Sequence, residues 1–184
     1  MVFDLVIRGG EVVDGTGSDP FRSDVAITGD RIVALGQFQD AEAGRVIDAS
    51  GMVVAPGFID VHNHSDGWLL KEKNFRCKTL QGFSTEVLMA DGISYAPVDR
   101  HNWRQWVHYL RPLNGLSLQD YDGWETLEDY MQRLDGRTSQ NVATHVPYAN
   151  VRALVNGFGC RPIDDSQQVR IRKLIEREMD AGAV

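Results

Sequence analysis

Two histidines one residue apart, His62 and His64, are the residues of this sequence whose type and spacing most directly indicate chemistry. On a β-strand, side chains alternate between faces, so the two imidazoles are predicted to point the same way, with Cβ atoms within about 7 Å. Two such imidazoles can share one metal ion, since neutral imidazole is a good zinc ligand. Adjacent histidines are also common on protein surfaces, so this pattern alone leaves both interpretations open.

The sequence before the histidines favours the metal interpretation. Pro56-Gly57 predicts a tight turn, and Phe58, Ile59 and Val61 predict a buried apolar strand that leads directly to the pair. We therefore expect His62 and His64 at the carboxyl end of the first strand of a parallel sheet.

Residues 56–184 alternate between strand and helix patterns. Apolar runs predict strands, and apolar residues at i, i+3, i+4 and i+7 predict helices with one face in a core. The predicted strands are 55–61, 84–90 and 141–146, and the predicted helices are 103–110, 127–134 and 166–181. Asp164 or Asp165 is suited to begin the last helix. This alternation is typical of βαβ units with a parallel sheet.

Residues 1–55 have a different sequence pattern, in which short runs of β-forming residues are separated by Gly and Asp. Val25–Ile27 and Ile32–Leu35 flank Gly29-Asp30 and predict a hairpin. Gly9-Gly10 and Ser50-Gly51 predict two more turns. The segment is expected to form a small antiparallel β-structure.

The composition excludes several classes of protein. The chain has 184 residues, with 19 Lys and Arg against 26 Asp and Glu, a formal charge of −7. An acidic chain without basic clusters is not expected to bind nucleic acid or an anionic membrane. No apolar run approaches the length of a membrane span. Residues Met1–Ile7 do not have the basic and then apolar pattern that begins a signal peptide, so none is expected. Cys77 and Cys160 form no CxxC pair, so reduced thiols and a cytoplasmic location are expected.

Four phrases, in this order, resemble the amino-terminal part of the amidohydrolase superfamily, and in particular its D-aminoacylase (N-acyl-D-amino-acid deacylase) branch. They are DLVIRGGEVVDGTG, DVAITGDRIVALG, VIDASGMVVAPGFIDVHNHSD and GFSTEVLMADGISYAP; residues 98–138 match only loosely. The resemblance implies an α/β fold with a (β/α)₈ barrel and a small β-sandwich. Residues 1–55 would be the amino-terminal share of the sandwich. Residues 56–184 would supply about three βα units of a partial TIM-type barrel.

The resemblance also implies site residues. His62 and His64 match the family's metal-binding pair, which holds one or two divalent ions, most often zinc. Asp91 stands where the branch has a metal-binding cysteine, and a carboxylate is an adequate zinc ligand. The alternative for Asp91 is a turn residue before Gly92. Tyr148 and His145 are candidate substrate contacts without a matching motif; the alternatives are a strand-end tyrosine and a packed core histidine.

The implied function is metal-dependent hydrolysis of the amide bond in N-acyl-D-amino acids or similar small N-acyl compounds. Two alternatives stay open: a cyclic-amide hydrolase of the dihydropyrimidinase or dihydroorotase kind, and a non-catalytic truncated relative. A whole barrel takes about 250 residues, many more than Pro56–Val184 provides. The family's catalytic aspartate is expected beyond Val184. We therefore expect a portion of a longer protein that is inactive alone; homo-oligomerisation is left open.

Overall fold

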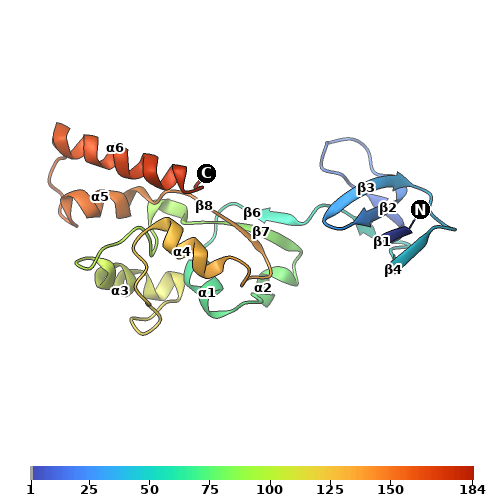
Figure 1. Cartoon of the computed structure of the whole chain (residues 1–184), viewed down its shortest axis with the longest axis horizontal. Helices are drawn as coiled ribbons and strands as arrows, with labels where there is room; N and C mark the ends of the chain where they lie inside the picture. The colour runs from blue at the N-terminus through green and yellow to red at the C-terminus, as the bar shows by residue number, and fades with distance from the viewer. Residues whose placement is uncertain (1) are drawn as a thin grey trace. The chain divides into compact units, whose positions relative to one another are not determined.

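The computed structural model describes residues 2–184, which form a mixed α/β structure with two separate sheets (Figure 1). The chain divides into two compact units, Met1–Pro56 and Gly57–Val184. Each unit has its own sheet and its own buried core, so each is described by itself.

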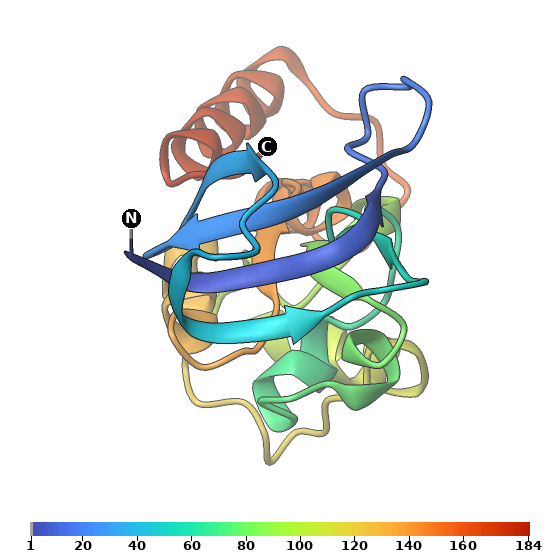
Figure 2. The same ribbon diagram turned by 90° about the vertical axis from the view of Figure 1, so that its right-hand side faces the viewer.

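The first unit is a five-stranded sheet. Its strands are β1 (Val2–Val12), β2 (Phe21–Thr28), β3 (Arg31–Gly36), β4 (Glu42–Asp48) and β5 (Val53–Val54). Figure 2 shows the order β3-β2-β1-β4, and β5 pairs with the end of β1. The β2–β3 hairpin confirms the prediction around Gly29-Asp30. The purely antiparallel prediction is wrong, because β4 and β5 both run parallel to β1.

Gly9-Gly10 does not form the expected turn. Strand β1 continues through both glycines, and its register with β2 shifts between Ile7 and Gly10, which marks a bulge. Gly9 has φ +74°, a conformation that favours glycine, and its N–H donates to Asp24 Oδ1 at 2.8 Å. A Cβ on Gly10 would lie 2.5 Å from Val54 Cγ2, so this glycine permits a close approach of the following strand.

The second unit is a three-stranded parallel sheet with helices. The strands β6 (Phe58–Asp60), β7 (Phe83–Leu88) and β8 (Asn141–Thr144) lie in that order and are each shorter than predicted. The predicted helices are confirmed as α3 (Trp103–Asn114), α4 (Leu127–Leu134) and α6 (Asp165–Asp180). Asp164 begins α6 with a capping box, because its side chain accepts from Gln167 N–H and Gln167 reaches back to the Asp164 N–H.

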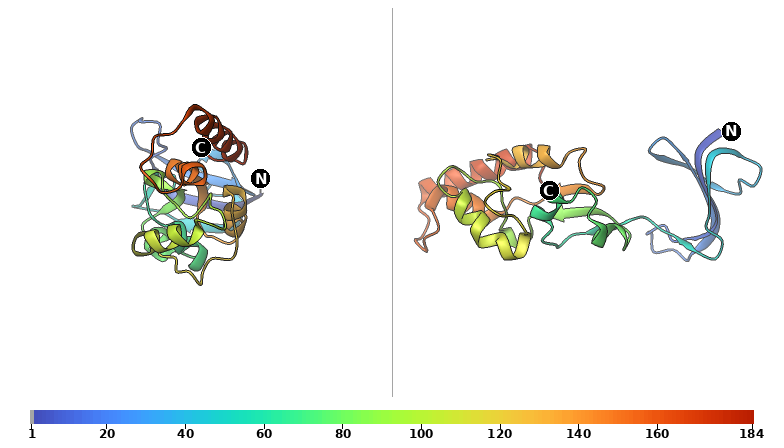
Figure 3. Two further views of the ribbon diagram at one scale, coloured as in Figure 1. Left: turned by 90° about the vertical axis from the view of Figure 1, so that its left-hand side faces the viewer. Right: turned by 90° about the horizontal axis from the view of Figure 1, so that it is seen from below.

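Four helical segments were not predicted: α1 (Asp66–Lys71), α2 (Arg76–Thr79), α5 (Tyr148–Asn156) and the 3₁₀ turn η1 (Ala90–Gly92). Three of them have six residues or fewer, too short for a helical repeat of apolar positions to be visible in the sequence. The fourth, α5, packs along α6 (Figure 3).

The core of the second unit joins the sheet to its helices. Leu88 from β7 packs in one cluster with Leu69 of α1, Trp106 of α3 and Tyr130 of α4. Phe58 and Ile59 of β6 are 59% and 61% exposed, so the prediction of a buried first strand is wrong for residues 2–184. Parallel sheets usually have both faces covered, so the exposure of β6 is unusual for a strand of this kind.

Among the described residues, no helix combines the length and the apolar character needed to cross a membrane.

Candidate metal centre

The two histidines lie in the loop between β6 and α1, not on a strand, because β6 ends at Asp60. Strand alternation is therefore the wrong reason for their orientation. Asn63, buried between them, shapes this loop instead. Its Nδ2 donates to the carbonyl oxygens of Asp60 (3.3 Å) and Val87 (3.2 Å), and its Oδ1 accepts from Ser65 N–H (3.1 Å). These bonds attach the loop to the end of β7.

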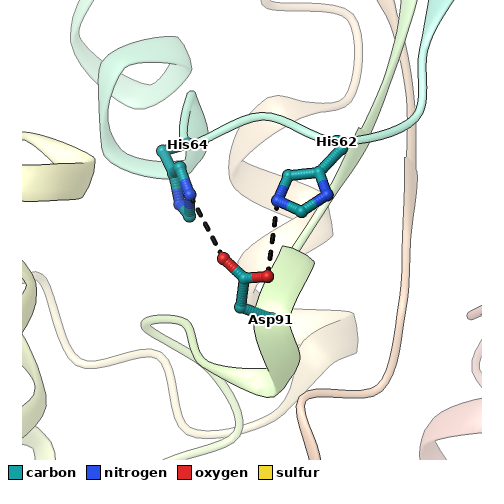
Figure 4. Close-up of side chains that lie close together, drawn as sticks. All are labelled: His62, His64 and Asp91. Carbon is teal, nitrogen blue, oxygen red and sulfur yellow. Dashed lines mark ion pairs between the residues drawn. The ribbon is translucent and has the colours of Figure 1, made fainter.

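Both imidazoles nevertheless face the same carboxylate, that of Asp91 (Figure 4). His62 Nε2 lies 3.3 Å from Asp91 Oδ1, and His64 Nε2 lies 3.4 Å from Asp91 Oδ2. The ring centroids of the two histidines are 6.0 Å apart. One ligand atom from each of the three residues lies within 4.8 Å of the others. The loops after two neighbouring parallel strands thus bring three possible metal ligands together.

Asp91 reaches this position through an unusual turn. It belongs to η1, which follows β7, and it has φ +59°, in the left-handed region. Met89, at the start of the turn, is fully buried and has φ +67°. Aspartate is tolerated in this region, whereas a long side chain such as methionine is uncommon there. The carboxylate of Asp91 points to the histidines and does not cap a neighbouring helix.

A buried carboxylate, Asp66, lies beside the three residues, and sequence analysis did not identify it. Its Oδ1 accepts hydrogen bonds from Met89 N–H (3.1 Å) and from Ser94 Oγ (2.5 Å). Burial raises the pKa of the Asp66 carboxyl, and the Ser94 hydroxyl opposes this rise. The sequence feature that could have identified Asp66 is its position two residues after His64, at the first residue of a short helix.

A second buried carboxylate, Glu86, lies in the middle of β7. Within residues 2–184, neither of its carboxylate oxygens has a hydrogen-bond partner. Burial raises the pKa of Glu86; the Ser65 hydroxyl, which is close but makes no hydrogen bond to it, and the Lys78 ammonium only partly oppose this rise. Lys78 itself forms an ion pair with Asp60 on the neighbouring strand.

The candidate substrate contacts lie at the end of the third strand. His145 directly follows β8, is half-buried, and its backbone N–H donates to Leu88 O at 3.1 Å. Tyr148 is the first residue of α5, not a strand-end residue, and is 49% exposed. It lines a hollow between α5 and α6 with Ile171. Within the described chain, no hydrogen bond or ion pair joins either side chain to Asp91, so their role in substrate binding stays a prediction.

The three converging residues have the donor set of a zinc site. Two imidazole nitrogens and a carboxylate oxygen are ligands that zinc accepts, at about 2.0–2.2 Å. Ligands at that distance in a tetrahedral arrangement lie about 3.4 Å from one another. Each imidazole lies 3.3–3.4 Å from a different oxygen of Asp91, and one ligand atom from each residue lies within 4.8 Å of the others, so the three side chains are near that spacing. The side chains of His62 and Asp91 are 64% and 50% exposed, so solvent and a small molecule can reach the site. The residues present therefore fit a divalent ion.

Comparison with protein families and curated sequences gives consistent matches. Residues 45–184 match the amidohydrolase family Amidohydro_3. The chain is 37% identical over 186 residues to the D-aminoacylase of Alcaligenes xylosoxydans xylosoxydans, covering 99% of this chain and 37% of that protein. It is 35% identical to the N-acyl-D-aspartate deacylase of the same organism, covering 98% of this chain and 35% of that protein. The chain spans little more than a third of the length of these relatives.

Solved structures give the same result. A crystal structure of D-aminoacylase superposes with a TM-score of 0.82 at 34% identity, covering 99% of this chain and 37% of that one. N-acyl-D-glutamate deacylase from Bordetella bronchiseptica, complexed with zinc and a phosphonate inhibitor, also has a TM-score of 0.82, at 30% identity over 100% of this chain and 38% of that one. A further structure of D-aminoacylase describes a binuclear metal centre.

Proposed function

Because this chain belongs to the amidohydrolase family, we propose that it forms the metal-binding part of an enzyme that hydrolyses the amide bond of N-acyl-D-amino acids. The observation that carries this proposal is the convergence of His62, His64 and Asp91 after two neighbouring parallel strands. The named deacylases that match nearly the whole chain support this substrate class.

The order and direction of the strands support the proposal that Gly57–Val184 forms the first units of a (β/α)₈ barrel. Strands β6, β7 and β8 lie side by side in chain order and are parallel, with helices between them, as in the first βα units of a (β/α)₈ barrel. Active sites of such barrels lie at the carboxyl ends of the strands, where the three converging residues are found. Phe58 and Ile59 point to opposite faces of the edge strand β6 and are both exposed, which is consistent with a barrel in which other segments pack against this strand. We assign the sheet of Met1–Pro56 to the amino-terminal share of a small β-sandwich.

At the site, His62 and His64 would hold one divalent ion, of which zinc suits this donor set, with Asp91 as a further ligand. When bound, such an ion polarises a carbonyl group and lowers the pKa of a water ligand toward about 7. Imidazole binds metal ions in its neutral form, so His62 and His64 would leave the positive charge of the ion intact. Asp91 contributes negative charge, and its two oxygens face different histidines, which holds all three side chains in one group.

We expect residues 1–184 alone to be inactive. Hydrolysis of an amide requires a positioned acid or base in addition to the metal ligands, and loss of such a group costs about 10²–10⁴-fold. The Asp66 carboxylate, two residues after His64, is fully buried and accepts hydrogen bonds from Met89 and Ser94. It is thus enclosed and cannot reach a substrate without rearrangement.

Zinc binding and hydrolysis test these statements separately. We expect the chain to bind zinc, and His62→Ala or His64→Ala to weaken binding at least about 100-fold. His108→Ala is the matched control, because His108 is an exposed histidine on α3. Equal zinc binding by the parent chain and both site variants would contradict the metal site. Turnover of N-acyl-D-amino acids at ordinary enzyme rates by residues 1–184 would contradict the expected inactivity, and turnover of cyclic amides would favour the alternative substrate class.

A further inference from the structure

The three candidate ligands belong to two separate loops, and one buried side chain joins these loops. Asp66 lies two residues after His64, at the start of α1, and its side chain is fully buried. A single oxygen, Asp66 Oδ1, accepts from Met89 N–H at 3.1 Å and from Ser94 Oγ at 2.5 Å. Met89 and Ser94 lie on either side of Asp91 in the sequence. The carboxylate therefore holds both ends of the short segment that carries Asp91.

That segment needs to be held, because its backbone is strained. Met89 and Asp91 have φ values of +67° and +59°. A left-handed conformation is unfavourable for a residue with a Cβ, and such conformations persist where the surrounding structure enforces them. The bond from Met89 N–H to Asp66 lies at the first of these two residues. Without it, a relaxed turn would move the Asp91 carboxylate relative to the histidines.

The partners of Asp66 are themselves fixed by the core. Asn150 of α5, fully buried, accepts from Ser94 N–H at 3.0 Å and donates to Ser94 O at 2.7 Å. The Tyr130 hydroxyl of α4 donates to the Asp66 carbonyl oxygen at 2.6 Å. Helices α4 and α5 thus immobilise both members of the Asp66–Ser94 pair. A side chain held in this way can transmit a fixed position to a neighbouring turn.

We infer that Asp66 is a positioning residue for the metal site: it fixes the Asp91 turn relative to His64 while touching neither the metal nor the substrate. This inference rests on the proposed function, since it requires that His62, His64 and Asp91 bind a metal ion. Partners that orient metal ligands from outside the coordination shell typically contribute 10–100-fold to metal affinity. Removal of the Asp66 carboxylate should therefore weaken metal binding although all three ligands remain present.

The test is titration of this chain with Co²⁺, whose visible absorption reports both affinity and ligand geometry, together with urea unfolding. We expect Asp66→Ala to bind Co²⁺ about 10–100-fold more weakly, with an altered spectrum. Asp66→Asn retains an oxygen that can accept from Met89 and Ser94, so its affinity should be within about threefold of the parent. Glu178→Ala is the matched control: Glu178 is also a buried acid that accepts a backbone N–H, from Leu127 at 3.0 Å, and it should leave Co²⁺ affinity unchanged.

The outcomes separate the two proposals. If His62→Ala binds Co²⁺ as tightly as the parent, the metal site itself is wrong. If His62→Ala loses binding but folded Asp66→Ala binds like the parent, the site stands and the positioning role is refuted. If Asp66→Ala does not fold, Ser94→Ala decides, because it removes only the hydroxyl that orients Asp66. We then expect about threefold to tenfold weaker binding, and unchanged affinity and spectrum would overturn the inference.

Discussion

Replacement of Asp91 by asparagine should separate a metal ligand from a surface ion pair. Asparagine has nearly the same shape and tolerates the left-handed conformation of this position, where φ is +59°. The turn should therefore keep its structure. The substitution removes only the negative charge and one acceptor oxygen, so any large effect must come from loss of the carboxylate.

The two interpretations predict different magnitudes. The side chains of His62, His64 and Asp91 are 64%, 28% and 50% exposed, and exposed pairs contribute about 0.2–1 kcal/mol each to stability. As an ion pair alone, Asp91 would thus change the free energy of unfolding by at most about 2 kcal/mol. As a ligand, it should contribute more than the 10–100-fold typical of partners outside the coordination shell. We expect Asp91→Asn to weaken zinc binding at least about 100-fold, or about 2.7 kcal/mol.

Isothermal titration with zinc and urea unfolding of the metal-free chain measure the two quantities. Asp122→Asn is the matched control, because Asp122 is an exposed aspartate that pairs with Arg133 at 2.9 Å, in a different part of the unit. The control should leave zinc affinity unchanged. If Asp91→Asn loses stability like Asp122→Asn but binds zinc as tightly as the parent, the reasoning that makes Asp91 a ligand is refuted.

Three further predictions concern stability. Glu86→Met should raise the free energy of unfolding by about 1–3 kcal/mol at pH 7, because it removes a buried carboxyl whose oxygens accept no hydrogen bond from any described residue. Since burial raises the pKa of Glu86 in the folded state, its penalty is absent below the unfolded pKa and grows as pH rises, so urea unfolding should show a smaller gain near pH 4. Gly67→Ala should lower the free energy of unfolding by about 3 kcal/mol in urea, because the added Cβ would lie 2.3 Å from Asn114 O. Gly159→Ala is the control: the atom nearest to its added Cβ is 4.0 Å away, so it should lower the free energy of unfolding by less than about 0.5 kcal/mol. Zinc at 100 times its dissociation constant should stabilise the chain by about 2.7 kcal/mol in thermal unfolding, and a chelator or His62→Ala should abolish this gain.

The sequence predicts those parts of the structure that depend on local patterns. Helix α6 is an example, since its apolar face and the Asp164 cap lie within one short segment. Strand β4 is a counterexample, because its direction relative to β1 depends on a crossover that no local pattern records. The exposed strand β6 shows the same limit: the apolar character of Phe58 and Ile59 predicts burial, but burial requires neighbours on both sides of a sheet.

The site shows a similar division between residue types and their placement. His62 and His64 could be selected from their type and spacing, and Asp91 from its place in a resembling phrase. The means by which they converge could not be predicted, because it depends on the hydrogen bonds of Asn63 to two strands and on a left-handed turn after β7. Asp66 was missed for the same reason, since its partners Met89 and Ser94 are more than twenty residues away in the sequence.

X-ray absorption spectroscopy of the zinc-loaded chain tests the central claim most directly, because it reports the atoms around the metal. We predict one tightly bound zinc with nitrogen and oxygen neighbours at about 2.0–2.2 Å and the outer-shell signal of two imidazoles, which falls to one imidazole in His64→Ala. A zinc-loaded chain whose spectrum lacks two imidazoles, or is unchanged in His64→Ala, would contradict a metal centre built from His62, His64 and Asp91.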